Sequence, residues 1–255
     1  MNRAKLLSSP RIFALPPGSL ALHDPAMPSP LSGARRLFRT QGPLLVLISL
    51  MFLIYFAQAT FGPGWYEGLM TVPVRILESW QHLLDGQASA ADWREFATLL
   101  SCAFLHGDLS HVAFNMLYFW IFGALIVELL GWRWMLLIFG VTAVGASLSH
   151  VLMNRSDLIP MLGASGALMG LEGAYLGLAM RWTLPNPHVW PLARPIPPGH
   201  LALLAVIGVS FDYFSIMNRE DMGIAYGAHV GGFTAGLLLA AIAAPRPRGR
   251  GVMKR

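Results

Sequence analysis

The apolar residues of this chain come in long, uncharged blocks separated by short polar stretches. A helix needs about 20 residues to cross a hydrocarbon core of about 30 Å, and most of the blocks reach that length. One block is interrupted only by Glu172, and the fifth continues past Asp212 to Met217. The blocks cover residues 44–61, 109–127, 135–153, 161–180, 201–211 and 224–244. The pattern predicts an all-α membrane protein built as a six-transmembrane-helix bundle.

The composition supports this interpretation. The 255 residues are 55% hydrophobic and only 12% charged, whereas soluble domains carry about 25% charged residues. Cys102 is the only cysteine, which excludes an internal disulfide and a cysteine metal cluster. The chain also lacks a His-Glu-x-x-His pattern. We therefore expect no metal and no cofactor.

The basic residues indicate the orientation. If the N-terminus lies inside, the inner segments hold 14 of the 18 Lys and Arg residues. The outer segments then keep Arg75, Arg94, Arg155 and Arg219, beside most of the acidic residues. By the positive-inside rule, both termini lie inside. The net charge of +5 is thus a topology signal, and the partner it suggests is the lipid bilayer rather than nucleic acid.

The spans divide the chain into three parts. Residues 1–41 are rich in Pro, Ser and Arg and predict a flexible basic tail; an acid-poor start of this kind also fits an organelle transit peptide. Residues 42–244 form the six-span domain, and residues 245–255 a short, basic, disordered tail. An outer segment, 62–108, carries four aromatic residues suited to the headgroup level: Trp65, Tyr66, Trp80 and Trp93. The proline-rich stretch 181–200 is predicted to be an inner connector.

Small residues line one face on each of two spans. Glycines recur at spacings of four, three and four on the fourth span, and two lie four apart on the sixth, following His229. Such faces let helix backbones approach closely, so the two helices are expected to meet there. The simpler alternative is that the glycines only pack helices. The residues are Gly166, Gly170, Gly173 and Gly177, with Gly232 and Gly236.

Polar residues at the edges of these faces suggest chemistry. Gly163-Ala164-Ser165-Gly166 places a hydroxyl at the head of an apolar helix, where backbone N–H groups are free. A serine needs a base to become a nucleophile, and a neutral histidine such as His229 is the usual one. Attack on a carbonyl then needs donors already in position for the oxyanion. Because polar groups inside a membrane are costly, their presence favours a function.

The second span offers such donors in the pattern His106-x4-His111-x3-Asn115. His111 and Asn115 are four residues apart, so they share a helix face. A single asparagine in a membrane helix more often hydrogen-bonds a neighbouring helix. Its combination with a serine and a histidine weakens that alternative.

In their order and spacing, these motifs resemble the rhomboid family of intramembrane serine proteases over roughly residues 43–244. Gly123-x4-Glu128-x2-Gly131 and the six-span layout add to the resemblance. It implies a Ser165–His229 dyad with Ser165 as nucleophile and His229 as general base. It also implies an oxyanion site made by the side chains of Asn115 and His111 with the Ser165 backbone N–H, in a turn shaped by Gly163. His106 would then be structural. The implied substrates are transmembrane proteins, cut in or near their membrane segment beside small residues.

Two departures from the family pattern are notable. Family members commonly carry Phe or Tyr four residues after the serine, whereas this chain has Met169, whose thioether can still contact an imidazole. Glu172 stands where an apolar residue is usual and needs a proton, a hydrogen bond or water to be tolerated. It follows Ser165 by two turns, about 10 Å, too far for an acid partner.

The sequence therefore predicts an intramembrane serine endopeptidase, with residues 218–223 as a mobile cap over the site. One alternative is a proteolytically silent relative, resembling the derlins, that binds membrane clients. Another is a small transporter, which Glu172 and the broken fourth span would favour. We expect a multi-pass protein of the bacterial inner membrane, with an organelle membrane as the less favoured location.

Overall fold

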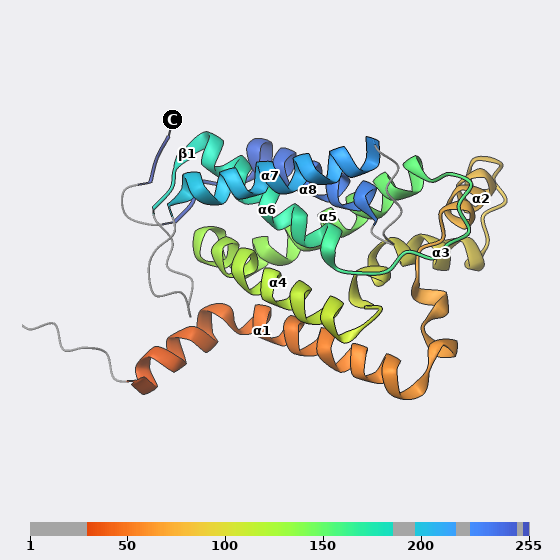
Figure 1. The fold of residues 1–255 in the computed structure, drawn as a ribbon, viewed down its shortest axis with the longest axis horizontal. Helices are drawn as coiled ribbons and strands as arrows, with labels where there is room; N and C mark the ends of the chain where they lie inside the picture. Colours follow the sequence, from red (N-terminus) through yellow and green to blue (C-terminus); the bar gives the residue numbers. More distant parts are fainter. Residues whose placement is uncertain (1–29, 186–196, 218–224, 249–251, 255) are drawn as a thin grey trace, which may run out of the picture.

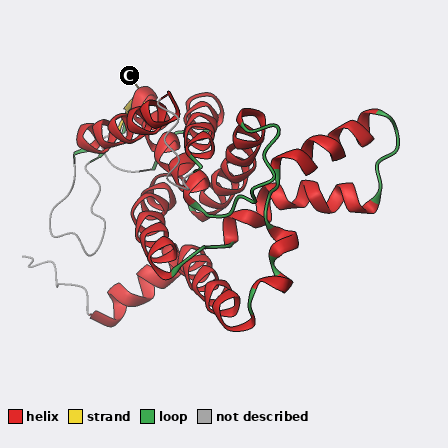
Figure 2. Cartoon of the chain, turned by 45° about the vertical axis from the view of Figure 1, so that its right-hand side comes forward, coloured by secondary structure: helices red, strands yellow, loops and turns green. Residues whose placement is uncertain are grey.

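The protein is a bundle of helices with almost no sheet (Figures 1 and 2). The computed structural model describes residues 30–185, 197–217, 225–248 and 252–254. The long helices are α1 (Pro30–Phe61), α4 (Leu109–Leu130), α5 (Trp132–Met153), α6 (Ser165–Arg181), α7 (Pro198–Met217) and α8 (Tyr226–Ala243). The shorter elements are η1 (Pro63–Trp65), η2 (Glu67–Leu69), α2 (Pro73–Leu84), α3 (Ala90–Ser101), η3 (Cys102–Phe104), β1 (Trp182–Thr183) and β2 (Met253–Lys254).

Four helices are long and apolar enough to cross a membrane among the described residues, namely Thr40–Phe61, Leu109–Leu130, Trp132–Met153 and Tyr226–Ala243. They match four of the six predicted spans. Helix α6 is apolar but has only 17 residues, because residues 161–164 form a turn ahead of Ser165. Helix α7 coincides with the fifth predicted span and its continuation to Met217.

Helix α6 lies at the centre of the bundle and packs against α8, α5, α4 and α7, most extensively against α8. Its side chains Leu168, Leu171 and Leu178 are fully buried. By contrast, only 17% of the best span window of α1 is buried, and α1 packs mainly on α4. The apolar outer surface of α1 fits contact with lipid, while α6 is shielded by protein.

The predicted contact between the two glycine faces is confirmed. A Cβ atom on Gly232 would overlap the Gly166 carbonyl oxygen, and one on Gly236 would overlap that of Gly170. A Cβ on Gly173 would overlap the carbonyl oxygen of Phe233 in α8. The backbones of α6 and α8 therefore touch, which only glycine permits.

The outer segment 62–108 is helical rather than an extended loop. Helices α2 and α3 pair with each other and contact α5; they lie at the right-hand end of the bundle (Figure 1). Ser89 begins α3 with a capping box: its side chain accepts from the Ala91 N–H, and Asp92 accepts from the Ser89 N–H. Such a cap stabilises a helix start. Trp80 and Trp93 remain exposed, as an interfacial segment requires.

The structure differs from the predicted tails at the tail residues that it describes. Helix α1 begins at Pro30, so residues 30–41 belong to the first helix; proline suits the first helical position. The described part of the C-terminal tail is docked: β2 pairs antiparallel with β1, and Val252 is buried. The Arg248 N–H donates to the Leu129 carbonyl (2.8 Å). Local composition predicted disorder, and backbone hydrogen bonds to distant elements override it.

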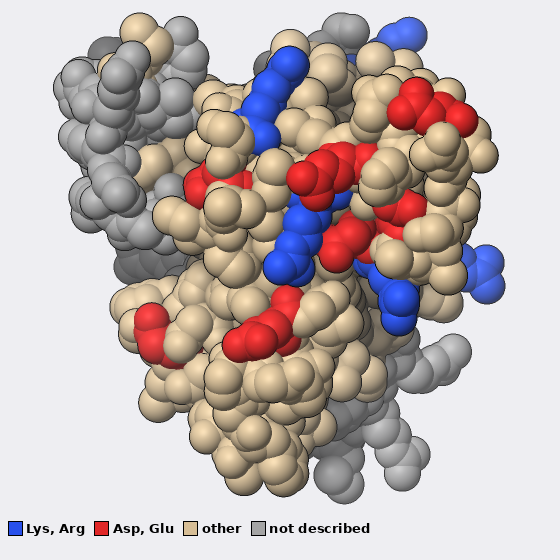
Figure 3. Space-filling model, turned by 90° about the vertical axis from the view of Figure 1, so that its right-hand side faces the viewer, with Lys and Arg blue, Asp and Glu red and all other residues tan. Residues whose placement is uncertain are grey.

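The two ends of the bundle differ in their charged residues. Acidic side chains are prominent on the surface at the α2 and α3 end, where several Lys and Arg side chains lie among them (Figure 3). The start of α1 and the C-terminus both lie at the opposite end (Figure 1). That end also carries Arg181 at the close of α6 and the described tail residues Arg246 and Arg248. The predicted charge asymmetry is thus present in three dimensions.

Candidate active site

The site is built around the first residue of α6. The Ser165 Oγ lies 2.8 Å from the Nε2 atom of His229 in α8. Both side chains are partly exposed. Because α6 and α8 touch through glycine, a side chain from each can reach the other. The structure therefore brings together the two residues that the sequence singled out.

The turn ahead of Ser165 is held from several sides. Met161 forms an isolated antiparallel bridge with Thr71, and the Gly163 N–H donates to the Cys102 carbonyl (2.9 Å). Gly163 has φ +127°, a conformation that L side chains rarely adopt. Ala164 caps α6 without a side-chain hydrogen bond, so the first N–H groups of the helix remain free for a ligand.

His111 lies against this turn. A Cβ atom on Gly163 would come 3.0 Å from His111 Nε2 and 2.9 Å from its Cε1. Gly163 thus has two reasons to be glycine, its positive φ and the ring beside it. Asn115, one turn further along α4, is 8% exposed, and its Nδ2 has no hydrogen-bond partner among the described residues. The structure therefore leaves a buried donor near the face where His111 meets the turn.

The start of α4 orients His111. Asp108 is the N-cap, and its Oδ1 accepts from the His111 N–H (2.8 Å) and from the Ser110 hydroxyl. The Ser110 hydrogen bond and the His111 backbone N–H lower the pKa of Asp108, so it stays a carboxylate acceptor. His106 is 1% exposed, and its ring packs edge-on against His111 with centroids 5.2 Å apart. Burial lowers the pKa of His106 to about 4, which keeps this ring neutral at pH 7.

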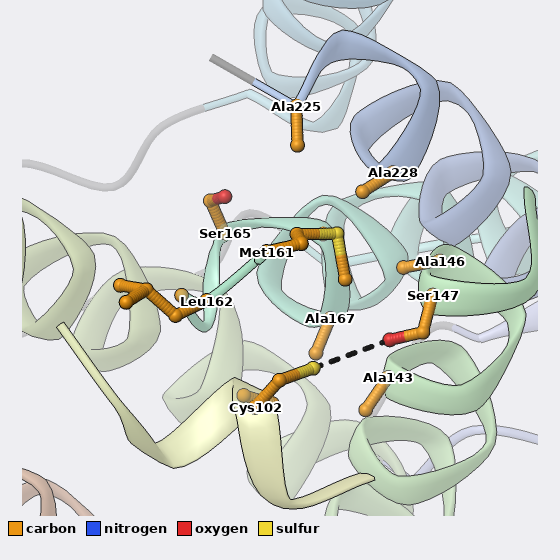
Figure 4. A pocket seen from close by; sticks show the side chains of 13 residues that line it. Cys102, Ala143, Ala146, Ser147, Met161, Leu162, Ser165, Ala167, Ala225 and Ala228 are labelled. Atoms are coloured by element: carbon orange, nitrogen blue, oxygen red, sulfur yellow. Dashed lines mark hydrogen bonds between the residues drawn. The ribbon is translucent and has the colours of Figure 1, made fainter. Parts of the chain in front are cut away.

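A small pocket adjoins Ser165 (Figure 4). Its walls include Cys102 and Ser147, whose Sγ and Oγ atoms lie 3.4 Å apart, together with the small residues Ala146 and Ala228. Burial raises the pKa of the Cys102 thiol, so this cysteine stays protonated. A protonated, buried thiol is a poor nucleophile, so Cys102 is not activated in this structure.

The structure shows the surroundings of Met169 and Glu172, the two residues that depart from the family pattern. The Met169 sulfur accepts a hydrogen bond from the Tyr118 hydroxyl (3.8 Å). The ring of Tyr226 packs edge-on against His229, with centroids 6.4 Å apart, so an aromatic neighbour comes from α8 itself. Glu172 is buried (3% exposed) in α6, two turns from Ser165.

Other candidates lie elsewhere. His150, near the end of α5, lies with its Nδ1 atom 3.3 Å from the Asn154 side-chain amide. The proposed cap, 218–223, lies outside the described residues. The sequence analysis did not single out Gln58 or Tyr226. The available signal for Gln58 was a lone amide inside an uncharged run, and for Tyr226 it was an aromatic ring one turn before His229. Within the described part of the chain, no group of three or more His, Cys, Asp or Glu residues could hold a metal ion.

The fold and this site define a multi-pass integral membrane protein whose two closest helices bring a serine and a histidine into contact. The family model described as "Rhomboid domain" matches residues 93–246, more than half of the chain. The chain therefore belongs to the rhomboid family.

Curated relatives carry the same family name. "RHOMBOID-like protein 1" of Arabidopsis thaliana is 31% identical over 157 residues, which are 61% of this chain and 36% of that protein. "Rhomboid protein 1, mitochondrial" of Saccharomyces cerevisiae is 28% identical over 52% of this chain and 41% of its own. "Rhomboid protease GlpG" of Yersinia pestis is 29% identical over 55% of this chain and 46% of its own. The chain thus matches less than half the length of each of these relatives.

Proposed function

We propose that this protein is an intramembrane serine endopeptidase that cleaves transmembrane proteins in or near their membrane segment. The observation that carries the proposal is the 2.8 Å distance between Ser165 Oγ and His229 Nε2. At that distance the hydroxyl can donate a hydrogen bond to Nε2 when that atom carries no proton, as a nucleophile and its general base require. Membership of the rhomboid family and similarity to a protein named as a protease support the same reaction.

The reaction would proceed by acyl transfer. His229 Nε2 takes the proton from Ser165 as the Oγ atom attacks the scissile carbonyl. The oxyanion that forms would face the Ser165 N–H and the side chains of His111 and Asn115, in the turn shaped by Gly163. His229 then gives its proton to the leaving amine, and water hydrolyses the resulting ester. The buried Nδ2 of Asn115 has no hydrogen-bond partner in the described part of the chain, which suits a donor kept for this charge.

The pocket beside Ser165 bears on substrate choice. Its alanine-rich lining leaves room for a small side chain beside the scissile bond and little for a large one. This fits substrates whose helix unwinds next to small residues, since a fully hydrogen-bonded helix hides its carbonyls from attack.

The proposal also covers the membrane topology, the domain bounds and the location of the protein. We take α1, α4, α5, α6, α7 and α8 as six spans with both termini inside. The catalytic domain is residues 42–244, to which α1 adds residues 30–41, and it lies between an N-terminal tail before Pro30 and the C-terminal tail 245–255. The end of the bundle that carries Arg181 and Arg248 would face the inner side. The bacterial inner membrane is the proposed location, with an organelle membrane as the alternative.

A covalent probe tests the function. A fluorophosphonate applied to the protein in detergent should label the wild type, and both Ser165→Ala and His229→Ala should abolish the labelling. Ser156→Ala is the matched control, since this serine is exposed in the turn that follows α5. Labelling that persists in Ser165→Ala would reject the nucleophile. A wild type that binds membrane proteins but never labels would favour the silent relative.

A further inference from the structure

Gln58 is a buried amide on α1, a helix with few buried side chains. It is 5% exposed, although α1 has the least buried of the four candidate spans. Its Oε1 accepts the backbone N–H of His106 at 3.1 Å, joining the outer end of α1 to the loop that precedes α4. Burying an amide in an apolar helix is costly, so this contact needs a reason.

The loop that Gln58 holds leads directly to His111. His106, whose N–H is bound, packs edge-on against the His111 ring. The next residue, Gly107, donates its N–H to His111 Nδ1 at 3.4 Å. The position of the 106–107 backbone therefore determines both the packing and the hydrogen bond of the His111 ring.

The Gly107 hydrogen bond also determines where the His111 proton lies. A backbone N–H can only donate, so Nδ1 must be the acceptor. In a neutral imidazole the single proton then lies on Nε2. Nε2 is the ring nitrogen that lies beside Gly163. Gly163 precedes Ser165 by two residues. An Nε2–H in this position can donate to an oxyanion, whereas a bare Nε2 would repel it.

We propose that Gln58 is a positioning residue for the oxyanion donor His111: by binding the His106 N–H, it holds Gly107 where its N–H keeps the His111 proton on Nε2. This inference rests on the proposed function and deepens it. Gln58 lies in the first span, outside residues 93–246 that the family model matches. It therefore adds a contribution from α1 to a site otherwise built from α4, α6 and α8.

A second glutamine on the same helix provides a control. Gln41 is also buried (4% exposed), and its Nε2 donates to the Ala124 carbonyl of α4 at 3.5 Å. It ties α1 to α4 near the other end of α4, away from His111. If buried glutamines on α1 only attach helices, substitutions at the two positions should act alike.

The experiment compares Gln58→Met, Gln58→Glu and Gln41→Met with the wild type in detergent. Methionine keeps the length of the side chain but removes the acceptor oxygen; glutamate keeps an oxygen in its place. We expect Gln58→Met to lower kcat and the rate of fluorophosphonate labelling about tenfold or more, with KM changed by less than about twofold. Gln58→Glu should keep most of the wild-type kcat and labelling rate. Gln41→Met should lower neither kcat nor the labelling rate. Equal losses in Gln58→Met and Gln41→Met would overturn the proposal.

A second measurement does not depend on activity. Nitrogen NMR of protein with ¹⁵N-labelled histidine, assigned with a His111→Ala variant, reports which ring nitrogen of His111 carries the proton. The wild type should show the proton on Nε2, and Gln58→Met should show a mixture of both tautomers. A wild-type proton on Nδ1 overturns the inference even if Gln58→Met fails to fold. Absence of Ser165-dependent labelling in the wild type would instead refute the proposed function.

Discussion

At the scale of single residues, the candidate site combines groups that are poor catalysts alone. The Ser165 hydroxyl gains a base only because His229 lies 2.8 Å away. His111 is held by Asp108, Gly107 and the turn at Gly163. Asn115 keeps a buried donor unused. Preorganisation of this kind lowers the cost of stabilising charge during the reaction.

Asn115→Ala should lower turnover about 10²-fold or more, because one oxyanion donor is lost. Cleavage of a transmembrane substrate should show the loss in kcat, with thermal unfolding close to the wild type. Asn115→Asp, which has the same shape but places an acceptor at the oxyanion, should be equally impaired. An unchanged rate in Asn115→Ala would remove this residue from the mechanism.

At the scale of helices, the pairing of α6 with α8 decides whether the site exists. The sequence showed this pairing through the spacing of glycines, and the structure confirms it. The sequence also predicted where most spans lie, because uninterrupted apolar runs have one stable solution in a bilayer. It did not predict α2 and α3, since their amphipathic pattern is interrupted by short turns.

Gly236→Ala should lower the free energy of unfolding by about 1–3 kcal/mol, because the new methyl group would overlap the Gly170 carbonyl. Gly140→Ala, on α5 where a Cβ meets nothing within 4 Å, should leave stability unchanged or raise it by up to about 1 kcal/mol. Unfolding in denaturing detergent measures both. Similar shifts in the two variants would contradict the close contact of α6 and α8.

The α2–α3 pair should show a pH dependence of its own. The His82 ring lies 2.8 Å from Asp92, and its hydrogen bond and charge raise the pKa of His82 from 6.5. Hydrogen bonds from Ser89 and His82 lower the pKa of Asp92. A raised histidine pKa contributes stability that is complete below pH 6.5 and is lost as the pH rises through the raised value. The Asp92 contribution is complete above pH 3.8 and is lost as the pH falls through the lowered value.

Hydrogen exchange of the α2 and α3 amides should therefore accelerate beyond the intrinsic rate as the pH rises from about 6.5 through the raised pKa of His82, because the His82 contribution fades. His82→Asn should abolish that extra pH dependence, whereas His150→Asn, in α5, should retain it. An identical profile in His82→Asn and the wild type would exclude the His82–Asp92 pair as its source.

At the scale of the whole molecule, the two ends of the bundle differ in charge and in structure. One end carries α2 and α3 with most of the described acidic side chains (Figure 3). At the other end, Arg181 of α6 donates to the Ala240 and Ala244 carbonyls at the end of α8. In the C-terminal tail, Arg246 donates to the Val252 carbonyl. The predicted asymmetry of charge is thus joined to a docked tail that local composition did not suggest.

This polarity predicts opposite accessibility in cells. In a Cys102→Ala background, Glu67→Cys should react with a membrane-impermeant maleimide from outside, because Glu67 is exposed at the α2 and α3 end. Lys254→Cys, exposed at the other end, should react only after permeabilisation. Both should react equally in detergent. External labelling of Lys254→Cys in intact cells would contradict an inner C-terminus.

The sequence by itself predicted the four apolar spans that the described residues contain and the two glycine faces that meet, and it singled out Ser165 and His229, which lie 2.8 Å apart. These follow from local rules, because lipid excludes unpaired polar groups and tight helix contacts demand small residues. Only the tertiary structure decided that Gln58 reaches His106, that Tyr226 packs on His229 and that the basic tail docks. Such contacts join residues distant in the chain, and their energies depend on which surfaces happen to face one another after the helices have packed.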